Sequence, residues 1–180
     1  MNYLIIGGSK SGKSELGERI ALSLNKDKVV YVATMKPYDK EDEKRINAHI
    51  ENRKGSNFMT LEKERDLHEI IDNIDSKDTV LIDSITSLLT NEMFFKNEII
   101  MNVSVNILKG LKKIIAGSKN TIIISDYIFS DAINYDEITE GFKKELALIN
   151  RELVKLCDNV IECSFGNIKY HREKINEKTL

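Results

Sequence analysis

Short apolar runs alternate along the chain with longer segments in which apolar residues recur every three or four positions. The runs are rich in β-branched residues and predict strands at residues 3–6, 29–33, 79–83, 121–125 and 160–163, with a candidate edge strand at 168–170. The helical spacing predicts helices at residues 15–24, 39–53, 67–74, 87–116 and 142–157, the fourth interrupted at Lys96-Asn97. Continuous apolar strands that alternate with helices indicate a parallel sheet covered on both faces.

Composition adds few constraints to this pattern. The 180 residues are 41% hydrophobic and 31% charged, as in ordinary globular proteins, and no repeat or change in composition marks a second domain. We therefore expect residues 1–180 to form one domain, with a polar, flexible tail at 172–180. The net charge of −2 argues against a nucleic-acid-binding surface, and no apolar stretch is long enough to span a membrane.

The most informative motif follows the first predicted strand and precedes the first predicted helix. It matches G-x-x-x-x-G-K-[ST], the phosphate-binding loop of P-loop NTPases, and consists of Gly7, Gly8, Ser9, Lys10, Ser11, Gly12, Lys13 and Ser14. Its backbone N–H groups and the helix N-terminus would bind a phosphate chain, Lys13 would reach the β- and γ-phosphates, and the Ser14 hydroxyl would ligate Mg²⁺. We therefore expect a P-loop NTPase-like (RecA-like) fold with a mostly parallel sheet. We also expect the protein to use GTP or ATP with Mg²⁺.

Two further features lead us to expect a cytoplasmic enzyme. The first residues lead directly into an apolar run, without the charged and apolar regions of a signal peptide. Cys157 and Cys163 lack CxxC spacing, and a phosphate-loop enzyme belongs in a reducing compartment, so we interpret both as free thiols.

Asp83 is the second candidate for chemistry. It ends the apolar run Val80-Leu81-Ile82, as the acidic residue of a Walker B element does. In that position it would hold Mg²⁺ directly or through water and offset phosphate charge. The alternative is an aspartate that caps a helix or forms a turn. The complete phosphate loop upstream favours the metal role over this alternative.

A charged segment after the second predicted strand carries the third candidate site. Arg45, His49 and Arg53 are spaced four apart, so a helix would place two guanidinium groups and one imidazole on a single face. Arginines recognise phosphate oxygens, and a neutral histidine can attack phosphorus. Nearby cations favour the neutral imidazole because they oppose its protonation. Spacing alone leaves open a second interpretation, a solvated charged helix with an incidental histidine.

Several ordered segments resemble the bifunctional adenosylcobinamide kinase / adenosylcobinamide-phosphate guanylyltransferases of cobalamin biosynthesis. The chain opens with the family's G-G-x-x-S-G-K-S, and residues 31–34 read Y-V-A-T. Residues 41–53 fill E-x-x-x-R-I-x-x-H-x-x-x-R, and residues 60–62 fill T-x-E. Residues 81–91 fill L-x-D-x-[LI]-T-x-x-[LV]-[ST]-N, and Ile149-Asn150-Arg151 lies where the family has V-N-[QR]. The resemblance is close to about residue 91 and looser to about residue 170.

The resemblance implies a role for each motif. It implies that His49 takes GMP from GTP through a phosphoramidate bond, which splits nucleotidyl transfer into two displacements. The phosphate loop and Asp83 would serve the kinase half, in which the hydroxyl of the aminopropanol arm of adenosylcobinamide attacks the γ-phosphate. The remaining nucleotide-binding residues that it implies are Thr34, Arg45, Arg53 and Glu62. It also implies a homo-oligomer, with a trimer as the expected state, in which a neighbouring subunit completes the site at residues 41–53.

The segment after the fourth predicted strand departs from the family pattern. The family usually has S-N-E-V-G and then G-x-V-P, whereas residues 125–132 read S-D-Y-I-F-S-D-A. The glycines, the glutamate and the proline are absent. Asp126 and Asp131 are the candidates to replace the missing carboxylate, and the exact corrinoid substrate depends on this segment.

Two alternative functions stay open at this point. One is a kinase without the transferase activity, which would act on cobinamide or on another small hydroxylated metabolite. The other is a GTP-binding regulatory protein. A guanine-specific N-K-x-D motif would favour the regulatory protein, and the sequence contains none. A histidine among spaced arginines favours transferase chemistry.

Overall fold

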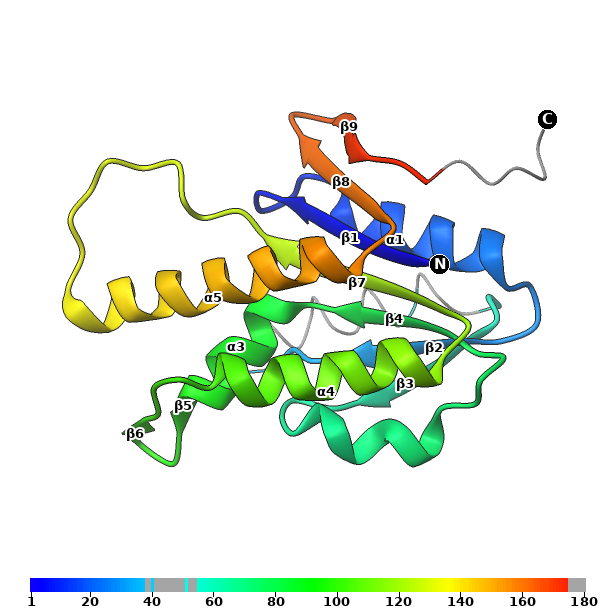
Figure 1. The fold of residues 1–180 in the computed structure, drawn as a ribbon, viewed down its shortest axis with the longest axis horizontal. Coiled ribbons are helices and arrows are strands. Elements are labelled where there is room, and N and C mark those ends of the chain that lie inside the picture. The colour runs from blue at the N-terminus through cyan, green and yellow to red at the C-terminus, as the bar shows by residue number, and fades with distance from the viewer. Residues whose placement is uncertain (38–39, 41–50, 52–54, 175–180) are drawn as a thin grey trace.

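A seven-stranded sheet forms the centre of the molecule in the computed structural model, which describes residues 1–37, 40, 51 and 55–174 (Figure 1). The strands are β1 (Asn2–Gly7), β2 (Val29–Ala33), β3 (Phe58–Glu62), β4 (Thr79–Asp83), β7 (Asn120–Asp126), β8 (Asn159–Ser164) and β9 (Asn167–Arg172). Their order across the sheet is β3-β2-β4-β7-β1-β8-β9. All neighbouring pairs are parallel except β8 and β9, which form an antiparallel hairpin at the edge.

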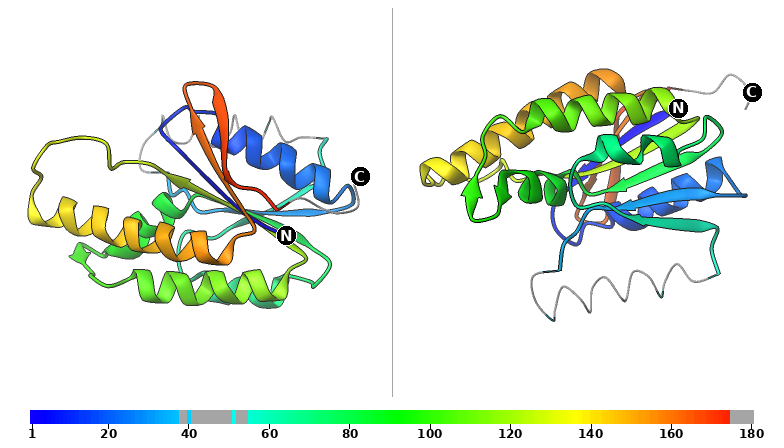
Figure 2. Two further views of the ribbon diagram at one scale, coloured as in Figure 1. Left: turned by 45° about the horizontal axis from the view of Figure 1, so that its top comes forward. Right: turned by 90° about the horizontal axis from the view of Figure 1, so that it is seen from below.

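Helices cover both faces of this sheet, as the two views in Figure 2 show. Helix α1 (Lys13–Leu24) lies on one face, where Leu16 and Ala21 pack against strand residues such as Ile5 and Ile122. The other face carries η1 (Leu67–Asn73), α3 (Ile85–Met93), α4 (Ser104–Gly117) and α5 (Glu137–Leu156). Alternate residues of the central strands enter the two cores because successive strand side chains point to opposite faces. This confirms the predicted mostly parallel α/β fold.

The five predicted apolar strands and the candidate edge strand are all present. The sequence analysis missed β3, because this edge strand is short and largely exposed and so lacks a continuous apolar run. Its parallel pairing with β2, which aligns Ala33 with Glu62, nevertheless brings its last residue to the carboxyl edge of the sheet.

The predicted helical stretch over residues 87–116 is two helices, α3 and α4, and its predicted interruption at Lys96-Asn97 is confirmed. There the chain forms a two-stranded antiparallel hairpin of β5 (Phe94–Phe95) and β6 (Glu98–Ile99). Lys96 and Asn97, at φ 51° and 63°, make its turn in the left-handed region that two-residue hairpins require. Helix α5 starts at Glu137 rather than at residue 142, because the Asp136 carboxylate caps it and accepts from Thr139 N at 2.9 Å.

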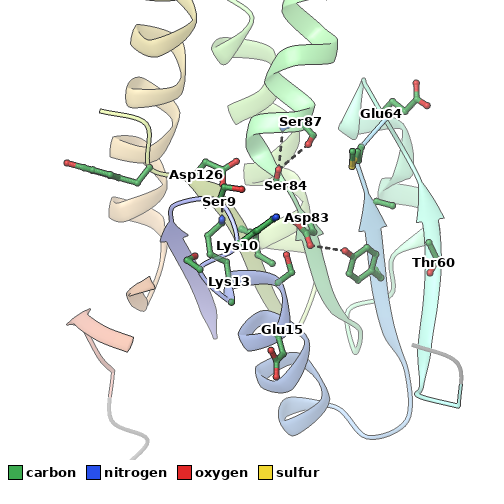
Figure 3. Close-up of a pocket in the computed structure, with 18 of the residues that line it drawn as sticks. Ser9, Lys10, Lys13, Glu15, Thr60, Glu64, Asp83, Ser84, Ser87 and Asp126 are labelled. Atoms are coloured by element: carbon green, nitrogen blue, oxygen red, sulfur yellow. Dashed lines mark hydrogen bonds and ion pairs between the residues drawn. The ribbon is translucent and has the colours of Figure 1, made fainter. Parts of the chain in front are cut away.

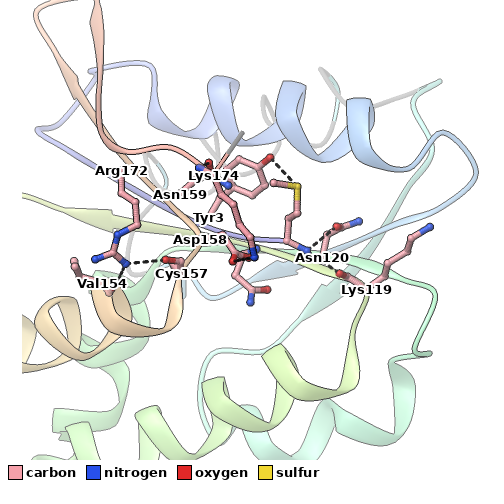
Figure 4. Close-up of polar contacts among 11 residues, drawn as sticks. Tyr3, Lys119, Asn120, Val154, Cys157, Asp158, Asn159, Arg172 and Lys174 are labelled. Carbon is pink, nitrogen blue, oxygen red and sulfur yellow. Dashed lines mark hydrogen bonds and ion pairs between the residues drawn. The ribbon is translucent and has the colours of Figure 1, made fainter. Parts of the chain in front are cut away.

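The N-terminus and residues 172–174 lie at the amino edge of the sheet (Figure 4). The Met1 amine donates to Lys119 O and Asn120 Oδ1, each at 3.0 Å. The Arg172 guanidinium donates to Val154 O at 2.6 Å and to Cys157 O at 3.1 Å. Lys174 Nζ lies 3.0 Å from Asp158 Oδ1. The part of the predicted tail that the structure describes, residues 172–174, is therefore anchored.

Both cysteines are buried and free, as predicted. Burial raises the pKa of the Cys157 thiol to about 12, and it also raises the pKa of Cys163. Because the thiolate is the reactive form, neither side chain is a nucleophile near neutral pH. Of the helices in the described part of the chain, none is both long and apolar enough to cross a bilayer.

Candidate nucleotide-binding and active site

The phosphate loop connects β1 to α1 at the carboxyl edge of the sheet (Figure 3). Gly7 ends β1, and a side chain there would collide with the Cys163 carbonyl oxygen, so only glycine fits. Gly12 immediately precedes α1 at φ 88°, a left-handed conformation that glycine adopts without steric cost. The backbone thus turns into α1 with the helix N-terminus facing the loop, the arrangement that binds phosphate in this motif.

Lys13 is the first residue of α1 and is buried, with only 8% of its surface exposed. Its Nζ donates to Gly8 O at 2.7 Å and lies 2.8 Å from Asp126 Oδ1, the contact drawn in Figure 3. A buried ammonium requires such partners because an unpaired charge is costly to remove from water. The same ammonium is available to phosphate oxygens once it exchanges these protein partners for them.

Asp83 ends β4 on the same edge of the sheet, as predicted. Its Oδ2 accepts a hydrogen bond from Tyr31 OH at 2.8 Å, which fixes the carboxylate toward the cavity (Figure 3). Within the described residues, no three His, Cys, Asp or Glu side chains form a metal cluster. A Mg²⁺ site here would therefore use the oxygen ligands of Ser14 and Asp83 together with nucleotide phosphates, a donor set that suits this ion.

One cavity of about 850 Å³ unites most of the predicted site residues. Those that line it are Ser9, Lys10, Ser11, Gly12, Lys13, Ser14, Glu62 and Asp83. Gly7 and Gly8 form the adjoining backbone of the loop. The cavity is large enough for a nucleoside triphosphate with part of a second substrate.

Thr34 lies behind the cavity wall and does not line it. It is fully buried, its Oγ1 donates to Ser84 O at 2.7 Å, and it accepts from Ser84 N at 2.7 Å. The Asn91 side chain also donates to Thr34 O at 2.8 Å. These contacts hold the end of β2 against the residue that follows Asp83. Thr34 ends the Y-V-A-T motif and Asn91 ends the motif at residues 81–91, so this contact gives both residues a structural role.

The predicted guanylyl-transfer residues Arg45, His49 and Arg53 lie outside the described residues. The predicted helix at 39–53 falls almost entirely there as well. Their roles therefore stay predictions from spacing and resemblance.

Asp126 was named in the sequence analysis only as a candidate to replace the missing carboxylate, and the structure places it at the site. It ends β7, which lies between β1 and β4, and its carboxylate faces the cavity beside Lys13. Asp131, the other carboxylate of the divergent segment, accepts from Tyr135 OH at 2.8 Å and pairs with Lys143 at 3.1 Å. It does not line the cavity, and these two contacts hold the pKa of its carboxyl below the ordinary value. Asp126 ends an apolar strand as Asp83 does, and that signal could have identified it.

The fold and this site define a P-loop nucleotide-binding protein of the RecA-like class. The chain is similar to the flagellar accessory protein FlaH from Methanocaldococcus jannaschii, with 18% identity and a TM-score of 0.55 over 96% of this chain and 78% of that one. It is also similar to the RadB recombinase, with 18% identity and a TM-score of 0.56 over 97% of this chain and 81% of that one. At these identities the likeness shows the fold alone.

Sequence comparison gives the narrower assignment. The model of the CobU family, cobinamide kinase / cobinamide phosphate guanyltransferase, matches residues 3–169. The chain therefore belongs to this family of cobalamin-biosynthesis enzymes, as the motifs predicted. A comparison with curated proteins gave no significant match.

Proposed function

We propose that the protein phosphorylates adenosylcobinamide and then transfers GMP from GTP to adenosylcobinamide phosphate. Membership of the family supports both activities. The observation that carries the kinase half is the cavity at the phosphate loop, where Lys13, Ser14 and Asp83 lie together. The donor of the first step is GTP or ATP. We further propose that the enzyme acts in the cytoplasm as a homo-oligomer, with a trimer as the expected state.

In the kinase half, the loop residues orient the triphosphate and oppose its charge. Backbone N–H groups of residues 8–14 and the N-terminus of α1 bind the β- and γ-phosphates, and Lys13 moves from Gly8 O and Asp126 to the phosphate oxygens. Ser14 and Asp83 would hold Mg²⁺, which when bound neutralises charge between the two phosphates. The substrate hydroxyl then attacks the γ-phosphorus, and the nucleoside diphosphate leaves.

In the transferase half, His49 is the proposed nucleophile. Its neutral imidazole attacks the α-phosphorus of GTP, the bond to the β-phosphate oxygen breaks, and pyrophosphate leaves. A phosphate oxygen of adenosylcobinamide phosphate then displaces the imidazole and takes the GMP. Arg45 and Arg53 would bind phosphate oxygens beside the histidine, and Glu62 and Thr34 complete the proposed nucleotide-binding set.

Replacing Asp83 with asparagine should weaken the dependence of kinase activity on Mg²⁺. The variant keeps the size of the side chain and a partner for Tyr31, so the fold should persist, but a charged ligand or ligand anchor is lost. We expect the Mg²⁺ concentration for half-maximal rate to rise by roughly tenfold or more, in line with loss of a metal-site residue. A titration of initial rate against Mg²⁺ checks this. A curve equal to that of the native protein would leave Asp83 only its structural hydrogen bond with Tyr31.

The proposed function is tested by following both products from one incubation. The native protein is supplied with adenosylcobinamide, Mg²⁺ and either ATP or GTP, and the corrinoids are separated and identified by mass spectrometry. Adenosylcobinamide phosphate with either donor establishes the kinase, and GDP-linked corrinoid with GTP establishes the transferase. Phosphate product alone would leave the kinase-only alternative. Nucleotide binding without either product would favour the regulatory protein.

A further inference from the structure

A carboxylate stands directly beside the phosphate-binding lysine. Asp126 Oδ1 lies 2.8 Å from Lys13 Nζ, and both side chains line the same cavity. Resting on the proposed kinase function, we propose that Asp126 is the general base of phosphoryl transfer, which takes the proton from the attacking hydroxyl of the corrinoid. Until nucleotide binds, the same carboxylate neutralises Lys13.

The backbone of Asp126 is held in place from three sides. In the parallel register of β1 and β7, Asp126 stands opposite Gly7, and Tyr127 N donates to Gly7 O at 3.0 Å. Asp126 N donates to Thr86 Oγ1 of α3 at 3.1 Å. The Asn150 side chain of α5 donates to Asp126 O at 3.5 Å. The carboxylate therefore projects from a fixed point beside the start of the phosphate loop, as a preorganised catalytic group requires.

The position of Lys13 sets the distance from Asp126 to the reacting phosphate. Two hydrogen bonds of about 2.8 Å that meet at one ammonium separate their acceptors by roughly 4.5 to 5.5 Å. This separation applies as Lys13 turns from Asp126 to a γ-phosphate oxygen, while its ammonium still contacts both. Because the backbone of Asp126 is held in place, the carboxylate then stays close enough for one hydroxyl to lie between it and the phosphorus. A nucleophile at about 3 to 3.5 Å from the reacting atom, with a base within hydrogen-bond reach, is the geometry that proton transfer needs.

The other described carboxylates of the cavity are less well placed for this role. Glu62 ends β3, which β2, β4 and β7 separate from β1, and Glu64 follows it in the chain. Glu15 lies in the first turn of α1, after the loop. Asp83 accepts from Tyr31 OH and belongs to the proposed metal site. Asp126 is the carboxylate on the strand adjacent to β1 and is in contact with Lys13.

The step balances without another reactant. The hydroxyl oxygen forms a bond to the γ-phosphorus, the bond from that phosphorus to the bridging oxygen breaks, and the nucleoside diphosphate leaves with the electron pair. The hydroxyl proton passes to an Asp126 carboxylate oxygen and then to solvent, since 28% of this side chain is exposed. Nucleotide binding must come first, because it draws Lys13 away and frees the carboxylate to accept a proton.

Asp126→Asn keeps the shape of the side chain and removes the base. We expect kcat for corrinoid phosphorylation to fall by about 10²-fold or more, the usual contribution of a general base. The dissociation constant for nucleotide should stay equal or decrease, because Lys13 loses a competing negative charge. The rise of kcat with pH on the acidic side should disappear. Asp131→Asn, a carboxylate of the same segment outside the cavity, is the matched control and should behave like the native protein.

Several results would overturn this role. One is a kcat for Asp126→Asn within a few-fold of the native value, with an unchanged dependence on pH. Another is a reduced kcat that still rises with pH on the acidic side. The third is a loss of nucleotide binding in the folded variant. Should Asp126→Asn not fold, Asp126→Glu carries the test. The displaced carboxylate should lower kcat by about tenfold or more while keeping the acidic limb, and a native kcat would contradict the proposal. If the native protein itself forms no corrinoid phosphate, the proposed function fails, which is distinct from the failure of Asp126.

Discussion

Replacing Lys13 with alanine should lower phosphoryl transfer to the corrinoid by at least about two orders of magnitude. Its ammonium is buried at the N-terminus of α1, where it opposes phosphate charge with little screening by water. The substitution also leaves the Asp126 carboxylate without its partner at 2.8 Å. That unneutralised charge would repel the triphosphate, so nucleotide affinity should decrease together with kcat.

Steady-state kinase rates and nucleotide titrations check this expectation, with a thermal melt to establish that the variant is folded. Lys144→Ala is a suitable control because it removes a lysine from an exposed position on α5. Near-normal phosphorylation by Lys13→Ala would remove the phosphate loop from the kinase reaction. The double variant Lys13→Ala/Asp126→Asn should bind nucleotide more tightly than Lys13→Ala, because the repelling carboxylate is gone.

The elements that the sequence predicted well are those with a strong local pattern. Val80-Leu81-Ile82 is apolar throughout because β4 is buried on both faces, and such runs are visible without knowledge of their neighbours. The phosphate loop is visible for a similar reason, since all its fixed positions lie within eight consecutive residues. Edge strand β3 lacks this pattern because it is largely exposed, and the β5–β6 turn depends on left-handed conformations at Lys96 and Asn97.

The site was predicted only as far as single segments define it. Asp83 ends its strand and could be assigned from that strand alone. Asp126 also ends an apolar strand, but its place beside the phosphate loop depends on the insertion of β7 between β1 and β4, which its own segment does not reveal. Thr34 shows the converse. It belongs to a recognisable motif, yet the structure directs its hydroxyl to the Ser84 backbone and not to the cavity.

Replacing His49 with alanine should abolish the covalent GMP adduct and GMP transfer, while phosphoryl transfer stays largely intact. The adduct requires a nucleophilic imidazole, whereas the kinase half depends on the phosphate loop, Asp83 and Asp126. The proposal rests on the spacing of Arg45, His49 and Arg53 and on the family resemblance. Cations one helical turn away on each side would oppose protonation of the imidazole and so keep it nucleophilic near neutral pH.

Intact-protein mass after incubation with GTP and Mg²⁺ measures the adduct, which should be labile in acid and stable in alkali, as a phosphoramidate is. His68→Ala is the matched control, because this histidine is exposed on η1 and does not line the cavity. If the native protein forms no adduct, the transferase proposal fails and the kinase-only alternative replaces it. Equal loss of both activities in folded His49→Ala would assign His49 to nucleotide binding shared by the two reactions. Loss of the adduct alone separates the two half-reactions, since it removes GMP transfer without disturbing the cavity that holds Lys13, Asp83 and Asp126.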